Sequence, residues 1–140
     1  MTGTRFNVRG LDKDGQVANF VETEQIICRD KGQISSFVQT RGSVPVFWQQ
    51  SPTMKYTPTI DLTRTTSQVR SAAEKHLVEQ LELYGDTVCV NLIDKKSDQL
   101  KLGKAFEGVV ENTKKKDQLG PNRLKYVWFD FHHECRKMKW

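Results

Sequence analysis

The sequence has few cysteines and no long apolar run, and both shortages narrow what the protein can be. Its three cysteines, Cys28, Cys89 and Cys135, are widely spaced and form no Cys-x-x-Cys pair. An odd, sparse set of this kind does not fit a disulfide framework, so we expect reduced thiols in a cytosolic setting. The apolar runs are far shorter than the ~20 residues that span a bilayer, and no basic segment followed by an apolar stretch opens the chain as in a signal peptide. We therefore expect a soluble, intracellular protein.

What the sequence does contain is enough for one ordinary domain of 140 residues, with 36% hydrophobic and 9% aromatic side chains. Its charge is uneven. Residues 1–93 have ten basic and ten acidic side chains, whereas residues 94–140 have twelve and seven, so the whole formal charge of +5 lies in the last third. Such a bias suits an anionic partner, namely a nucleic acid, a phosphorylated substrate or an acidic membrane surface. It also fits a solvated face, and the three consecutive lysines at 114–116 favour that interpretation and predict an exposed loop.

The first half of the chain predicts strands. Residues 5–9 and 17–28 are strand-like, and each is followed by a turn, Asp12-Lys13-Asp14-Gly15 and Asp30-Lys31-Gly32 respectively. Residues 36–39 predict a further strand. Pro45 cannot donate to a strand ladder, so we expect residues 44–48 to form an edge strand or an extended loop. The proline- and hydroxyl-rich residues 49–66 predict a connecting loop.

The second half predicts helices that alternate with strands. Ser71 and Glu74 form a capping-box pattern before a helix that Gly85 is placed to end. Its expected apolar face is Ala73, Leu77, Leu81 and Tyr84. Residues 87–93 and 124–131 predict strands, and a second amphipathic helix, weakened by Gly103 and Gly108, lies between them with an apolar face of Leu102, Phe106, Val109 and Val110. Helix–strand alternation favours parallel strands with crossover helices, so the predicted fold class is α/β, a mixed sheet with flanking helices in which a β-rich half precedes helix–strand units.

Two polar clusters interrupt the predicted strands of the first half. Glu22 and Glu24 lie two residues apart and so share a strand face, where they could share a proton or a cation or form an exposed polar face. Arg41 stands beside Gly42 and Ser43, and a glycine-containing turn of this kind can present backbone N–H groups and a guanidinium to a phosphate. A plain surface turn explains the second cluster equally well.

A third cluster, Asp130 to Cys135, lies at the end of the last predicted strand, where α/β folds place their sites. His132, His133 and Cys135 suggest zinc, but a tetrahedral site needs a fourth ligand, and the remaining histidine, His76, lies on a predicted helix. A nucleophilic role for Cys135 would follow from its basic neighbours. The bulky residues 136–140 after it do not form a tight anion cradle, so we interpret Cys135 as structural.

These clusters carry a family resemblance. Residues 19–25 (Asn-Phe-Val-Glu-Thr-Glu-Gln), residues 36–48 (Ser-Phe-Val-Gln-Thr-Arg-Gly-Ser-Val-Pro-Val-Phe-Trp) and residues 129–132 (Phe-Asp-Phe-His) resemble motifs of the Sac-domain phosphoinositide phosphatases. Residues 8–10 (Val-Arg-Gly) and 90–92 (Val-Asn-Leu) match in order and spacing, and the similarity runs from about residue 5 to residue 140.

The resemblance implies that the chain comes from an enzyme that removes phosphate from the inositol headgroup of membrane phosphatidylinositol phosphates through a phosphocysteine intermediate, without a metal or other cofactor. The family's Cys-x5-Arg-Thr/Ser loop follows the Asp-Phe-His motif and is expected after residue 140, so residues 1–140 are expected to be an incomplete domain, the first half of the catalytic subdomain, and inactive alone. No catalytic residue is therefore assigned here.

The resemblance also gives the candidate residues a role. Arg41, Asp130 and His132 are the candidates for supporting the headgroup pocket, while Glu22 and Glu24 would position basic groups. The implied partners are phosphatidylinositol phosphates and, in the full-length protein, the cytosolic face of intracellular membranes. The alternative is a non-catalytic module that binds anionic lipid or protein. Nucleic acid is not expected, because the basic residues do not cluster on one predicted helix and no known nucleic-acid-binding motif is present.

Overall fold

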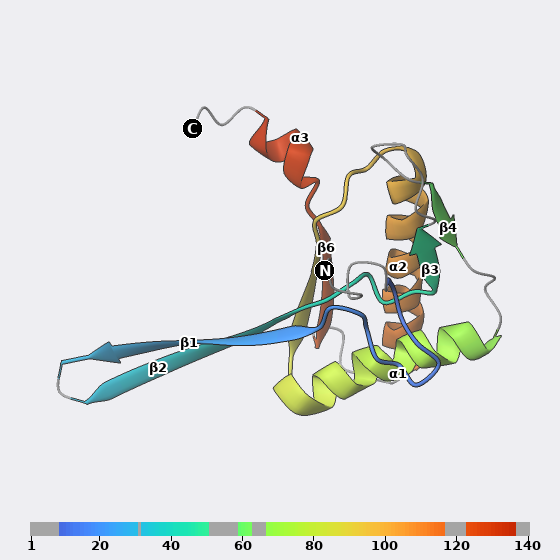
Figure 1. The fold of residues 1–140 in the computed structure, drawn as a ribbon. Helices are drawn as coiled ribbons and strands as arrows, with labels where there is room; N and C mark the ends of the chain where they lie inside the picture. The colour runs from blue at the N-terminus through green and yellow to red at the C-terminus, as the bar shows by residue number, and fades with distance from the viewer. Residues whose placement is uncertain (1–8, 31, 51–58, 63–66, 117–122, 137–140) are drawn as a thin grey trace, which may run out of the picture.

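Two long helices, one short helix and three pairs of strands are the regular elements of the described part of the chain (Figure 1). A computed structural model describes residues 9–30, 32–50, 59–62, 67–116 and 123–136. The elements follow in the order β1 (Val21–Arg29), β2 (Gln33–Arg41), β3 (Trp48–Gln50), β4 (Ile60–Leu62), α1 (Ser67–Tyr84), β5 (Thr87–Asn91), α2 (Ser97–Lys116), β6 (Leu124–Trp128) and α3 (Phe131–Cys135). The predicted mixed α/β class, with strands before helix–strand units, is confirmed. No helix among the described residues has both the length and the apolar character needed to cross a membrane.

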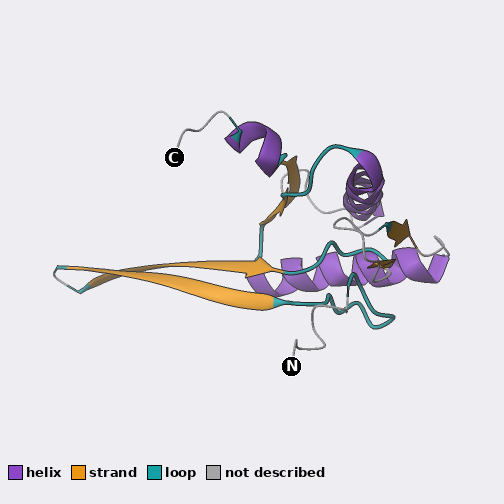
Figure 2. Ribbon diagram, turned by 45° about the horizontal axis from the view of Figure 1, so that its top comes forward, coloured by secondary structure: helices purple, strands orange, loops and turns teal. Residues whose placement is uncertain are grey.

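Strands β1 and β2 form a long antiparallel hairpin that extends away from the helices (Figures 1 and 2). Its base is held on α1, where the Tyr84 hydroxyl donates a hydrogen bond to the Glu22 carboxylate and the Thr40 hydroxyl lies 3.4 Å from Gln80 Oε1. All nine residues of each strand are exposed. The predicted turn after residue 29 is confirmed, since Gly32 takes a φ of +76°, which favours glycine.

The β5–α2–β6 unit is the predicted parallel pair with a crossover helix. Val90 is opposite Val127, and Asn91 is opposite Trp128. Helix α2 covers this pair, and α1 packs across α2. The central core contains one stripe from each helix together with parts of the sheet and the loop before β3, namely Val46, Leu77, Leu81, Leu102, Phe106, Val110 and Leu124. The predicted apolar faces of both helices are therefore buried, except that Tyr84 and Val109 are only partly so.

Several boundaries differ from the sequence prediction. The strand predicted from residue 17 begins at Val21, because Asn19 takes a φ of +59° and turns the chain just before it. The predicted loop over residues 49–66 contains parts of the short strands β3 and β4, which pair antiparallel. Of the two predicted forms of residues 44–48, the structure has the loop over residues 44–47, and strand β3 begins at Trp48.

The helices also depart from prediction at their ends. Helix α1 starts at Ser67 rather than after Ser71, since no glycine or proline in residues 67–70 stops it from extending toward the N-terminus. Glu74 does not close a capping box and instead pairs with Lys116 at 2.7 Å. The lysines at 114–116 form the last turn of α2 rather than a loop. Predictions on residues 5–8, 51–58 and 63–66 lie outside the described residues.

The two glycines of α2 have different surroundings. A Cβ atom added at Gly103 would lie 2.2 Å from the Trp128 ring, whereas one added at Gly108 would meet no heavy atom within 4 Å. The Tyr126 hydroxyl also donates a hydrogen bond to the Gly103 carbonyl at 3.3 Å. The missing side chain of Gly103 thus lets Trp128 of β6 pack closely against α2. This packing offsets the lower helix propensity of glycine.

These surroundings predict opposite effects of the same substitution. Gly103→Ala should lower the free energy of unfolding by about 1–3 kcal/mol through overpacking against Trp128. Gly108→Ala should raise it by up to about 1 kcal/mol through helix propensity. Thermal and urea unfolding of both variants measure the difference, and equal effects of the two substitutions would contradict the close approach at Gly103.

Candidate functional site

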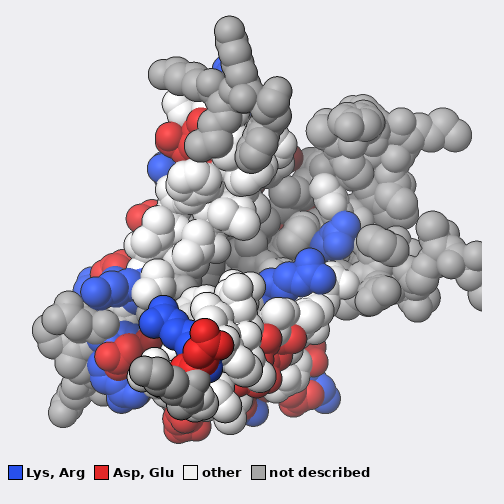
Figure 3. All heavy atoms as spheres, turned by 90° about the vertical axis from the view of Figure 1, so that its left-hand side faces the viewer, with Lys and Arg blue, Asp and Glu red and all other residues white. Residues whose placement is uncertain are grey.

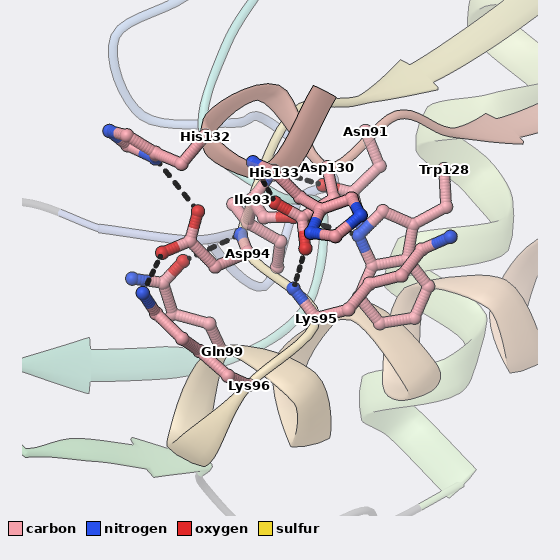
Figure 4. A network of polar contacts seen from close by, with 10 residues as sticks. All are labelled: Asn91, Ile93, Asp94, Lys95, Lys96, Gln99, Trp128, Asp130, His132 and His133. Atoms are coloured by element: carbon pink, nitrogen blue, oxygen red, sulfur yellow. Dashed lines mark hydrogen bonds and ion pairs between the residues drawn. The ribbon is translucent and has the colours of Figure 1, made fainter. Parts of the chain in front are cut away.

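The carboxyl ends of β5 and β6 lie side by side because the two strands are parallel, and the segments that leave them form a polar network (Figure 4). The loop of residues 92–96 leaves β5, and residues 129–130 lead from β6 into α3. The Phe129 N–H donates to the Asn91 carbonyl at 2.9 Å and fixes the start of this divergence. The edge therefore has the position at which open α/β sheets usually place ligands.

Asp94 is the centre of the network. The residue is only 7% exposed, and each of its two carboxylate oxygens has a side-chain partner. Oδ1 lies 2.7 Å from His132 Nδ1 on α3, and Oδ2 lies 3.2 Å from Lys96 Nζ. The Asp94 N–H donates to Gln99 Oε1 at 2.8 Å, which ties the loop to the first turn of α2. One buried carboxylate thus connects the loop after β5, helix α2 and helix α3.

The contacts of Asp94 keep it charged. Burial raises the pKa of its carboxyl, but the hydrogen bonds from His132 and Lys96, together with their positive charge, outweigh burial and lower the pKa below its ordinary value. The His132 side chain is 74% exposed, so Asp94 holds one ring nitrogen while the rest of the imidazole faces solvent. This arrangement orients an accessible imidazole at the edge of the sheet.

Asp130 joins the same two segments a second time. Its Oδ2 accepts a hydrogen bond from the Lys95 N–H at 2.9 Å, and its Oδ1 accepts one from the His133 N–H at 3.1 Å. The second bond makes Asp130 the N-cap of α3. The backbone hydrogen bond from Lys95 is the main reason that the pKa of Asp130 lies below its ordinary value. The strand predicted for residues 124–131 accordingly ends at Trp128, and residues 131–135 are helical.

Trp128 supports this edge from the sheet. Its indole Nε1–H donates to the Ile93 carbonyl at 2.8 Å, and Lys95 Nζ lies 5.5 Å from the ring centroid in a cation–π contact. Beneath it, the buried Asn91 donates from Nδ2 to the Tyr126 hydroxyl at 2.9 Å and accepts the Ile93 N–H at 3.2 Å. The loop of residues 92–96 is therefore fixed on both sides.

The structure brings two of the three predicted pocket residues together and leaves the third elsewhere. Asp130 and His132 both belong to the network, whereas Arg41 ends β2 at the base of the hairpin, with no described ion pair and no described contact to either. Glu22 and Glu24 share a strand face, as predicted, and Glu22 accepts a hydrogen bond from Tyr84 rather than from a basic group.

Asp94, Lys95 and Lys96 were not among the predicted site residues. They directly follow the predicted β5 strand, and the rule that parallel strands present their carboxyl ends at one edge could have paired them with Asp130 and His132. Among the described residues, which include His132, His133 and Cys135, no group of three or more histidine, cysteine or acidic side chains has an arrangement that could hold a metal ion. His76 is buried in α1, where desolvation lowers its pKa.

The basic excess of the last third is partly neutralised in the folded chain. Five of its lysines and arginines form ion pairs among the described residues, namely Lys96 with Asp94, Lys101 with Asp98, Lys114 with Glu111, Lys116 with Glu74, and Arg123 with Asp86. On the face shown in Figure 3, basic and acidic side chains are interspersed rather than gathered by sign. This distribution favours the solvated interpretation of the basic residues over a single anion-binding surface.

The lowered pKa of Asp130 predicts a loss of stability in acid. Because the folded pKa lies below that of the unfolded chain, the carboxylate stabilises the fold above about pH 4, and this contribution is lost as the pH falls further. Asp130→Asn should lower the Tm at neutral pH and show a smaller further fall between about pH 5 and about pH 3. Thermal unfolding of both proteins across this pH range measures the fall in Tm, and Asp86→Asn is the control at an exposed carboxylate. An equal fall in Asp130→Asn and the unsubstituted chain would contradict the role of Asp130.

Comparisons with known proteins agree with the resemblance. The family model described as "SacI homology domain" matches residues 1–136. The chain is 44% identical over 143 residues to phosphatidylinositol-3-phosphatase SAC1 of Saccharomyces cerevisiae and 44% identical over 138 residues to the protein of the same name from Drosophila melanogaster, in each case with 99% of this chain and 22% of the relative covered. It is 42% identical to human phosphatidylinositide phosphatase SAC2, covering 98% of this chain and 11% of that protein. The chain thus spans about a fifth or less of the length of these relatives, and it belongs to the SacI homology domain family of phosphoinositide phosphatases.

Proposed function

We propose that this chain is part of an enzyme that removes phosphate from the inositol headgroup of membrane phosphatidylinositol phosphates. The observation that carries the proposal is its similarity, over 99% of its length, to proteins named for this activity. The reaction proceeds through a phosphocysteine intermediate formed on a Cys-x5-Arg loop outside residues 1–140. The enzyme acts at the cytosolic face of intracellular membranes.

The network at the edge of β5 and β6 supports this reaction by positioning rather than by chemistry of its own. Asp94 pairs with the Lys96 and His132 side chains, and Asp130 adds a second carboxylate that accepts the Lys95 and His133 backbone N–H groups, so the network is not a strongly positive cradle for a phosphate. The positive charge of Lys96 offsets part of the repulsion that Asp94 would exert on an incoming anion. The exposed imidazole of His132 is held at Nδ1, and with a proton on both ring nitrogens its Nε2–H can donate to a phosphate oxygen.

Arg41 supplies the charge that the network lacks. Its guanidinium is on an exposed strand end, and the described residues give it no carboxylate partner. A guanidinium without such a partner can donate two parallel hydrogen bonds to phosphate oxygens. In the full-length enzyme, Arg41 and His132 therefore approach the headgroup from different elements, and the nucleophile loop completes the pocket.

Arg41→Ala tests this role in the full-length enzyme. Loss of a charge-assisted contact of about 1.5–3 kcal/mol should reduce kcat/KM for a short-chain, water-soluble phosphatidylinositol phosphate by roughly 10- to 100-fold. Arg29→Ala is the matched control, because Arg29 lies on the same face of the same hairpin but at its far end. Phosphate release unchanged in Arg41→Ala, or reduced equally in both variants, would exclude a specific role for Arg41.

Residues 1–140 alone should release no phosphate from any phosphatidylinositol phosphate, because the nucleophile and its arginine are absent. Phosphate release above background would place a nucleophile within the chain, and Cys135→Ser would show whether it is Cys135. Cosedimentation with anionic vesicles at rising salt, in the same preparation, tests the binding-module alternative. Strong binding that salt reverses, together with an inactive full-length protein, would favour the alternative over the proposed enzyme.

A further inference from the structure

The outer part of the β1–β2 hairpin has an apolar belt that nothing described in the structure covers. The belt consists of Ile26, Ile27, Ile34, Phe37 and Val38, which are 57%, 51%, 69%, 62% and 38% exposed. Contiguous exposed apolar side chains of this size are uncommon on the free surface of a folded protein and mark a surface that another structure buries.

The belt is apolar on both faces of the hairpin. Glu24 is opposite Val38 and Cys28 is opposite Ile34, so Val38 and Ile34 share the face of Ile26. Gln25 is opposite Phe37, which puts Phe37 on the other face with Ile27. A hairpin with one buried and one solvated face would alternate apolar and polar residues, whereas apolar residues on both faces are typical of strands covered from two sides.

Contacts at the base of the hairpin fix its direction, and the described residues give no further strand partner to β1 or β2. Contacts of Glu22 with Tyr84 and of Thr40 with Gln80 hold the base on α1. Among the described strands, β1 and β2 pair only with each other, so each has an unpaired outer edge. Figures 1 and 2 show the outer half projecting away from both long helices. An isolated two-stranded hairpin is marginally stable in water, so its extended form points to additional partners.

The charges around the belt argue against a membrane as the covering layer. Arg29 and Asp30 lie at the tip, beyond the belt, while Glu24 is opposite Val38 at its inner boundary and Glu22 lies nearer the base. Insertion of the tip into a bilayer would carry the charged Arg29 and Asp30 side chains into the hydrocarbon, which is energetically unfavourable. A belt between two charged zones instead fits a protein layer on each face, with the tip in solvent.

The lengths of the relatives indicate which polypeptide could form the layers that cover the belt. This chain aligns with 22% of the length of the yeast and fly proteins, so most of such a protein lies outside residues 1–140. We propose that the part of the full-length chain outside residues 1–140 covers the apolar belt on both faces, which makes the hairpin an internal layer with Arg29 and Asp30 left in solvent. This inference concerns assembly of the protein and does not depend on the proposed chemistry.

Cys28 is a native reporter for this cover. It is exposed here and lies on the face of Ile26 and Ile34. In the full-length protein without lipid, maleimide labelling of Cys28, followed by mass spectrometry of its peptide, should be at least tenfold slower than labelling of Asp30→Cys in a Cys28→Ser background. Cys89 is not expected to interfere at neutral pH, because burial raises the pKa of its thiol to about 11.

Four results of this labelling would overturn the proposal. Cys28 could react as fast as the cysteine at position 30, which would leave the belt uncovered. Both thiols could be protected, which would bury the tip. Protection of Cys28 only after addition of phosphatidylinositol phosphate vesicles would make a membrane the cover. Protection only at high protein concentration would make a second copy of the chain the cover.

A pair of neighbouring substitutions tests the same cover without labelling. Ile34→Thr and Gln33→Thr introduce the same strand-favouring residue at adjacent positions of β2. Burial of Ile34 in the full-length protein predicts that Ile34→Thr lowers the Tm by several degrees, whereas Gln33→Thr leaves it within about one degree. An unchanged Tm in Ile34→Thr would show that Ile34 stays in solvent and would exclude the cover.

Discussion

The parallel pairing of β5 with β6 is the constraint on which the rest of the described structure depends. It requires a crossover helix, which α2 supplies, and it places the segments after Asn91 and Trp128 at the same edge. The core formed by α2, α1 and β6 holds that arrangement, since Leu102, Phe106, Val110 and Leu124 are almost completely buried. Without this register, Asp94 and His132, which are 38 residues apart in the sequence, would not be neighbours.

The parts of the fold that follow from local chemistry could be predicted from the sequence. The apolar faces of α1 and α2 have helical spacing, and both are buried as that spacing indicates. Gly85 takes a φ of +76° and ends α1, and Gly32 turns the hairpin. The alternation of helix and strand was sufficient to predict a parallel pair. In each case, the signal and the structure that it specifies lie within a few residues of each other.

The parts that were missed depend on contacts between distant segments. The glycine at position 103 lowers helix propensity, and only the approach of Trp128 explains its presence. The predicted strand continues to Phe131, whereas Asp130 caps a helix there and also accepts a hydrogen bond from the Lys95 N–H. Asp94 was not identified because its role depends on its contacts with His132, Lys96 and Gln99. Gln99 on α2 and His132 on α3 become its neighbours only in the folded chain. Motif resemblance made Asp130 and His132 candidates but gave no information on Asp94, the carboxylate that contacts His132.

Among the described residues, the two long helices and the β5–β6 pair bury apolar side chains against one another, whereas the β1–β2 hairpin leaves its apolar side chains exposed. The β5–α2–β6 unit and α1 share a core, and their polar side chains pair with one another, so the edge that carries His132 is already ordered. The described hydrogen bonds between the β1–β2 hairpin and α1 lie at the base of the hairpin, near Arg41, the candidate headgroup contact for which the described residues give no carboxylate partner. A site that needs both Arg41 and His132 thus depends on how the hairpin is held relative to the sheet. The layers that bury the belt of the hairpin would fix that relation, and packing far from the phosphate would then determine the geometry of the pocket.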